Sequence, residues 1–193
     1  VIRAADATAC TAEQLNTIND ATSVAVDLTN VTALAASSLA DLGTLATAIG
    51  NNEFINDSGL TTIAVSDTTI DATTLATRID SYDSINGDGT TDMTLPSGAT
   101  INVDADEVDH MLADESAGRL TIGDQAITVT NAITVDQANL LTATTSGVVT
   151  ATIATTETVT ELATLNADGG NNALTIVIRA ADATACTAEQ LNT

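Results

Sequence analysis

Two patterns of hydrophobic and polar residues alternate along this chain of 193 residues. In the first, aliphatic residues recur at three- or four-residue spacing, in several cases after a Ser, Thr or Asp, which predicts an N-capped helical turn or two. This pattern occupies residues 11–18, 38–45, 72–79, 105–112, 135–142 and 159–166. In the second, apolar and polar residues alternate one by one, which predicts a strand. This pattern occupies residues 23–28, 61–66, 91–96, 118–123, 150–155 and 173–178.

The paired segments recur with a roughly constant period. One aliphatic residue in each helical segment serves as an anchor for measuring that period. The anchors are Leu15, Leu42, Leu75, Val108, Ala138, Leu162 and Leu191. Their spacing runs from 24 to 33 residues and averages about 29. This period is typical of solenoids, whose units bury their apolar faces only against neighbouring units.

A much longer repeat lies over this short one. Residues 1–17 read VIRAADATACTAEQLNT, and residues 177–193 repeat the same seventeen letters. We therefore predict that residues 1–176 form one large tandem repeat of about six coils, and that residues 177–193 begin the next identical repeat. The alternative is a globular domain with a duplicated tail. On the first interpretation the partners of the protein are copies of itself, joined covalently or stacked end to end.

The spacing of strands and helices separates two kinds of solenoid. Stacked strands lie about 4.8 Å apart and packed helices about 8–10 Å apart, so a full helix in each coil makes the stack fan out. Because the helical segments here are short and rich in Thr, we expect a mainly β fold. This would be a β-solenoid of about six coils, each with a strand and a short helical turn. The alternative is a leucine-rich-repeat-like α/β solenoid, whose strand pattern residues 60–70 follow, except that Thr68 replaces Asn.

The charge of the chain excludes several classes of partner. It has 26 acidic residues against 4 Arg and no Lys, which gives a net charge of −22. No cationic surface for nucleic acid can be assembled from so few bases, and anionic membranes would repel the chain. No apolar run reaches the roughly 18–20 residues that a transmembrane helix needs, so we expect no membrane insertion. Because 44% of the residues are hydrophobic and regularly placed, we expect a folded chain despite the charge.

The segment DSINGDGTTD, residues 83–92, is similar to a calcium-binding loop. It keeps the Asn, Asp and Gly of a D-x-N-x-D-G motif, but Ser84 stands at the first ligand position. Calcium takes six to eight oxygen ligands, and the side chains here supply four or more of them. We therefore predict calcium as a cofactor, held by Asp83, Asn86, Asp88 and Asp92. An ordinary turn of Asn, Gly and Asp is the alternative.

The chain offers little for catalysis. His110 is its only His, so a Ser–His–acid triad would have to include it, and a position on a helix surface is the simpler interpretation. Paired carboxylates suffice for some carbohydrate-cleaving enzymes. Their grooves usually also present aromatic platforms, however, and Phe54 and Tyr82 are the only large aromatic residues here. We therefore expect no enzyme activity and no catalytic residues.

The two cysteines occupy the same position in the two copies of the repeated segment. They are Cys10 and Cys186. Six stacked strands would separate them by roughly 29 Å, far beyond the reach of a disulfide of about 7 Å between Cα atoms. We therefore expect each to be a small buried hydrophobic residue, with an intermolecular bond as the alternative.

Several phrases of the sequence, TAEQLNT, DATSVAVD and TSGVVTATIATTETVTELATLN, point to a class of protein. They resemble very long Thr/Ala/Asp-rich tandem-repeat surface proteins of marine bacteria, the cyanobacterial cell-surface giants. There is a weaker likeness to tail-fibre repeats of cyanobacterial viruses. The resemblance implies an extracellular or cell-surface location and a structural or adhesive role. We therefore expect a structural component of an extracellular fibre, stalk or surface layer. The alternative is an adhesive or carbohydrate-binding module of a giant surface protein.

Overall fold

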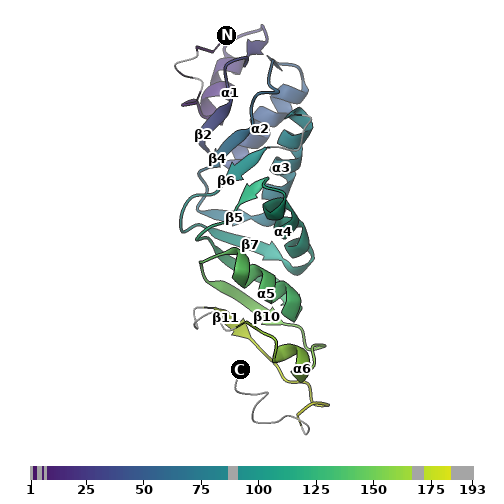
Figure 1. Ribbon diagram of the computed structural model, residues 1–193. Helices are drawn as coiled ribbons and strands as arrows, with labels where there is room; N and C mark the ends of the chain where they lie inside the picture. Colours follow the sequence, from purple (N-terminus) through teal and green to yellow (C-terminus); the bar gives the residue numbers. More distant parts are fainter. Residues whose placement is uncertain (1, 4–5, 7, 87–90, 167–171, 184–193) are drawn as a thin grey trace.

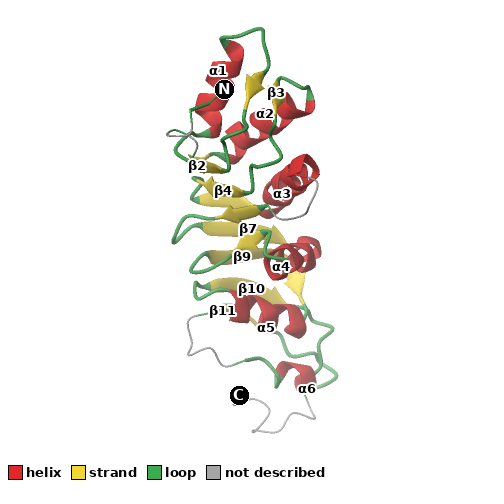
Figure 2. Cartoon of the chain, turned by 45° about the horizontal axis from the view of Figure 1, so that its top comes forward, coloured by secondary structure: helices red, strands yellow, loops and turns green. Residues whose placement is uncertain are grey.

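The molecule is elongated, and its elements follow one another from the N-terminal end to the C-terminal end (Figure 1). The computed structural model of the chain describes all residues except 1, 4–5, 7, 87–90, 167–171 and 184–193. Strands stack along the length of the molecule, and helices lie along one side of that stack (Figure 2). We use the word unit for one helix together with the strands that come after it.

Helices form in all six segments in which the sequence predicts them. They are α1 (Ala12–Asp20), α2 (Leu39–Gly50), α3 (Ala72–Asn86), α4 (Val108–Ser116), α5 (Val135–Thr144) and α6 (Val159–Leu162), and the 3₁₀ turn η1 (Ala105–Glu107) precedes α4. Side chains that accept hydrogen bonds from the first turn explain where several of them begin. Thr11, Thr134 and Thr158 each form a capping box with a Gln or Glu three residues later.

All the described strand pairs are parallel. The strands are β1 (Val26–Asp27), β2 (Ala33–Ser37), β3 (Phe54–Ile55), β4 (Thr62–Val65), β5 (Thr69–Asp71), β6 (Asp92–Thr94), β7 (Thr100–Asp104), β8 (Leu120–Thr121), β9 (Ala126–Ile133), β10 (Val149–Ile153) and β11 (Ala173–Thr175). Within the described residues they form three sheets, in the orders β1-β3, β2-β4-β6-β8 and β5-β7-β9-β10-β11. Each strand therefore pairs with the equivalent strand of the next unit.

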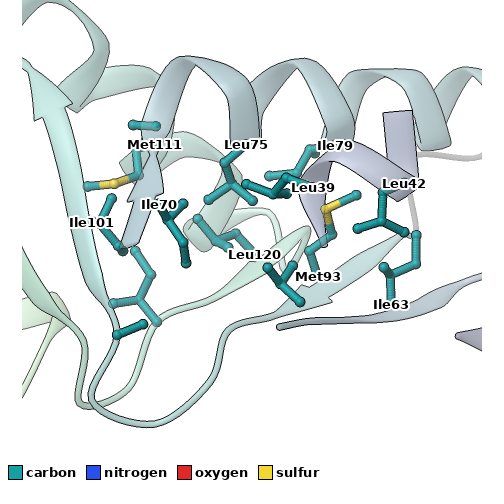
Figure 3. Packing of buried hydrophobic residues seen from close by; sticks show 14 of the residues in the cluster. Leu39, Leu42, Ile63, Ile70, Leu75, Ile79, Met93, Ile101, Met111 and Leu120 are labelled. Atoms are coloured by element: carbon teal, nitrogen blue, oxygen red, sulfur yellow. The ribbon is translucent and has the colours of Figure 1, made fainter. Parts of the chain in front are cut away.

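The register of these pairs shows that one unit of sequence advances the stack by one strand. Ile63 of β4 lies opposite Met93 of β6, and Ile101 of β7 lies opposite Ile127 of β9. Figure 3 shows Ile63, Met93 and Ile101 in the layer of apolar side chains that also contains Leu75 of α3, and Ile127 belongs to the same buried cluster. The six described anchor residues of the sequence period lie on six successive α-helices, and all are buried.

The expectation of a mainly β solenoid is wrong. Within the described residues, 36% are helical and 25% lie in strands, so the molecule is a mixed α/β fold with parallel sheets. The helices exceed the predicted turn or two, since α2 has 12 residues and α3 has 15.

Threonine explains the error. Its β-branched side chain favours strands, but a helical Thr hydroxyl can donate to the carbonyl one turn earlier. Thr17, Thr44, Thr47, Thr77 and Thr144 all donate to the carbonyl four residues before them. The Thr-rich segments are therefore compatible with full helices.

Candidate functional site

A cluster of charged side chains lies between α3 and the end of α4. The guanidinium of Arg119 is 2.9 Å from the Asp83 carboxylate at Nη1, and its Nη2 pairs with Oδ1 of Asp114. Asp80, one turn before Asp83, lies 3.9 Å from Nη1. One cation thus faces three acids from two neighbouring units.

Burial distinguishes Asp114 from the other acids of this cluster. Its side chain is 1% exposed, whereas that of Asp80 is 59% exposed. Burial raises the pKa of the Asp114 carboxyl, and the positive charge of Arg119 acts in the opposite direction. The hydrogen bond to Asp83 raises the pKa of Arg119, so the guanidinium stays charged. The buried Asp114 carboxylate is therefore stabilised by the charge of Arg119.

His110 lies on the outer side of this cluster. Its Nε2 is 4.0 Å from Asp114, its Nδ1 is 3.7 Å from Glu107, and its side chain is 42% exposed. The space between α3 and α4 beside Asp114 is lined largely by aliphatic side chains and has no room for a water molecule. The geometry suits a structural contact between units.

The residues predicted to hold calcium are directed to different partners. Asp83 pairs with Arg119 in the cluster described above. Asn86, the last residue of α3, donates through Nδ2 to the carbonyl of Leu60 at 2.7 Å and to the hydroxyl of Thr91 at 2.5 Å. Asp92, in β6, accepts a hydrogen bond from a hydroxyl of the next unit at 3.0 Å.

The fourth predicted ligand, Asp88, lies outside the described residues. Among the residues that are described, no three His, Cys, Asp or Glu side chains gather in a way that could hold a metal ion. The buried Oδ1 of Asn86 has no hydrogen-bond partner among the described residues. Calcium at these residues stays a prediction.

A groove of about 800 Å³ lies beside α1 at the N-terminal end of the molecule. Its lining includes Arg3, Cys10, Glu13, Thr17 and Ile18. The side chain of Arg3 is 82% exposed, and Ile18 is 42% exposed although it is aliphatic. The groove is thus half apolar and carries both signs of charge.

The described part of the repeated segment forms the outermost layer over β1 and β2. The backbone N–H of Ile2 donates to the carbonyl of Asp27 in β1 at 3.2 Å, and the N–H of Ala35 in β2 donates to the carbonyl of Cys10 at 3.0 Å. Cys10 is buried, as the sequence predicts for a small hydrophobic residue, and burial raises the pKa of its thiol. Ile2 and Cys10 of this layer also line the groove.

Neither the charged cluster nor the groove is among the sites that the sequence predicts. Arg119 could have been found from its rarity, because each Arg in a chain with 26 acids and no Lys has many possible carboxylate partners. The groove could not, because it depends on how residues 2–18 lie against β1 and β2. The sequence marks residues 1–17 only as a repeated segment and does not indicate a groove there.

Comparisons with family models, with curated proteins and with solved structures find no match to this chain. Within the described residues, no helix is both long and apolar enough to cross a membrane. The function is therefore argued from the geometry alone.

Proposed function

We propose that this chain is a structural component of an extracellular fibre, stalk or surface layer built from tandem copies of its mixed α/β repeat. The observation that carries the proposal is the single direction in which parallel strands accumulate, from β2 at one end to β11 at the other. Each unit adds a strand by the same kind of pairing. Further units can extend such a stack without new geometry.

The ends of the stack also support a repetitive assembly. Strand β11 has a hydrogen-bonded strand on one side only within the described residues, and Ile176 and Val177 just after it are 45% and 50% exposed. An open edge with exposed aliphatic side chains is a template for further pairing. The net charge of −22 acts in the other direction, because it keeps the sides of neighbouring assemblies apart.

The alternative function, an adhesive or carbohydrate-binding module, receives less support. Sugar-binding surfaces usually offer exposed aromatic faces. Phe54 is 2% exposed and Tyr82 is 0% exposed, and the chain has no other Phe, Tyr or Trp. Neither ring can stack on a saccharide. Adhesion would have to use polar loops.

The proposal is tested with chains that contain one, two and three copies of residues 1–176, each ending in residues 177–193. Small-angle X-ray scattering should show a maximum dimension that grows by a constant amount with each added copy, with an unchanged cross-section. Antibodies against the chain should label intact cells of the source organism. A cross-section that grows with copy number, or labelling only after cells are opened, would contradict the proposal.

A further inference from the structure

The two copies of the repeated segment make the same contacts between their Arg and Asp residues. The Nε of Arg3 donates to Asp6 at 2.9 Å, and the Nε of Arg179 donates to Asp182 at 2.7 Å. The N–H of Asp6 donates to the carbonyl of Arg3, and that of Asp182 to the carbonyl of Arg179, at 2.9 and 3.0 Å. The described positions that the two copies share thus make the same two contacts at opposite ends of the molecule.

The surroundings of the two copies differ. In the second copy, Nη1 of Arg179 donates to the carbonyl of Thr156, in the turn between β10 and α6, at 3.1 Å. The side chain of Arg179 is 33% exposed, against 82% for Arg3. Asp182 is 25% exposed, against 50% for Asp6. The second copy thus has a preceding unit against it, and the first copy has a groove in that place.

Each copy therefore shows the contacts of the segment with only one of its two neighbouring units. The first copy shows the contacts with the unit after the segment: Ile2 bonds to Asp27, and Nδ2 of Asn30 donates to the carbonyl of Ile2 at 2.7 Å. The second copy shows the contact with the unit before it, in which Thr156 lies between β10 and α6. The contacts of the two copies involve different sides of the segment, so one segment could make both sets at once.

The other arginines show how Arg3 would complete this stack. The Nε of Arg78 in α3 donates to the carbonyl of Leu39, at the start of α2, at 3.0 Å. Arg119 binds Asp83 in the unit before its own, and Arg179 reaches the turn before α6. Each reaches back by one unit. The described contacts of Arg3 stay within its own turn.

We propose that, in a tandem chain, the groove beside α1 of each following copy is the docking surface for the segment from β10 to α6 of the copy before it, placed in line. Residues 177–193 of one copy are residues 1–17 of the next, so the arginine that is Arg179 of the first copy and Arg3 of the second donates to the Thr156 carbonyl of the first copy. The exposed Ile18 and the apolar floor at Cys10 would be covered by this contact. This inference rests on the proposed function and adds the geometry of the joint. Because the same seventeen residues occupy the joint from either side, a tandem chain forms it without any additional linker.

The test uses a two-copy chain in which residues 18–193 are appended after Thr193, so that residues 177–193 form the junction. Two single-cysteine versions retain the thiol of either Cys10 or Cys186, the same position at the junction. Cys10 is 8% exposed and lines the groove, so a small local movement lets a thiol reagent in the groove reach it, whereas the junction thiol would be covered from both sides and react only after the two copies separate. We expect the junction thiol to react at least about tenfold more slowly with a disulfide reagent.

Arg179→Ala in the two-copy chain should accelerate the reaction of the junction thiol, and the matched variant Arg3→Ala should leave it unchanged. Scattering provides a second measurement that does not depend on these variants: an in-line joint gives a straight particle of twice the length. Equal reactivity of the two thiols, or a particle bent freely at the junction, would overturn the docking surface. That result would still be compatible with a fibre of flexibly joined copies at the cell surface. The docking surface can therefore be refuted without refuting the proposed structural role.

Discussion

Replacing Arg119 by Met isolates the electrostatic contribution of the charged cluster. Methionine keeps an unbranched apolar stem and removes the guanidinium. Asp114, which is 1% exposed, then loses its closest opposite charge, and Asp83, which is 12% exposed, loses the same partner. A buried carboxylate without a partner is strongly destabilising.

The loss of stability in Arg119→Met has an upper limit, because the Asp114 carboxyl can take up a proton. A carboxyl group that cannot be stabilised as an anion takes up a proton, at a cost of about 1.4 kcal/mol for each pH unit above its pKa in the unfolded chain. With an unfolded value of 3.8, the limit for Asp114 is about 4 kcal/mol at pH 7 and about 2 kcal/mol at pH 5. In the variant the folded pKa is raised above the unfolded value. The folded state therefore binds more protons between the two values, and stability falls as pH rises through that window.

Urea unfolding followed by circular dichroism at pH 7 and pH 5 measures the difference. We expect Arg119→Met to lose about 2–4 kcal/mol at pH 7 and clearly less at pH 5, where protonation of the Asp114 carboxyl costs less. Adding Asp114→Asn to the variant should remove most of the pH dependence. Arg3→Met, at an arginine that is 82% exposed, is the matched control and should change little. An equal loss at both pH values would refute the electrostatic reasoning.

Three further predictions address packing, titration and metal binding. Gly147→Ala should destabilise the chain by more than about 2 kcal/mol in urea unfolding, because a Cβ there would lie 2.6 Å from the backbone carbonyl carbon of Gln125; Gly50→Ala, with open space around it, should be nearly neutral. Hydrogen bonds from Thr29 and Asn56 lower the pKa of Asp27 to about 2, so its stabilisation is lost only as pH falls through that value; Thr29→Ala should move the NMR titration midpoint toward 3.8, and an unmoved midpoint would contradict this. If calcium binds, EGTA should lower the melting temperature and added calcium restore it, whereas identical transitions would exclude a stabilising site.

The sequence was sufficient to locate the repeating elements because their signals are local. Capping residues such as Thr11 and Thr134 determine where helices begin, and each anchor residue marks the buried side of its helix. The lengths of the helices were not predictable in the same way. They depend on neighbouring helices that bury the later turns, as where Tyr82 of α3 donates from its hydroxyl to the carbonyl of Leu42 in α2 at 3.1 Å.

The candidate site was less accessible from the sequence than the fold. The segment from Asp83 to Asp92 has the spacing of a calcium loop, but the pattern contains no sign of Arg119, which lies 36 residues after Asp83. That arginine is brought to Asp83 by the stacking of one unit on the next. Contacts between units are therefore what a motif search misses, and in this molecule they include the charged cluster and the groove beside α1.

Many acidic side chains contact a neighbouring unit of the stack, although the chain has very few basic residues. Most of these carboxylates accept hydrogen bonds from neutral amide or hydroxyl groups and do not form salt bridges. The pairs across units are Asn19 with Glu53, Asn56 with Asp27, Ser97 with Asp124, Thr121 with Asp92, Asn131 with Asp104, and Gln137 with Asp109, at 2.5–3.1 Å. A carboxylate that accepts a hydrogen bond from an amide or hydroxyl keeps its charge at a lowered cost. Such contacts depend less on ionic strength than exposed ion pairs do. A chain with a net charge of −22 can therefore lengthen by identical units without a supply of basic residues, and its arginines remain available for the contacts that reach back along the stack.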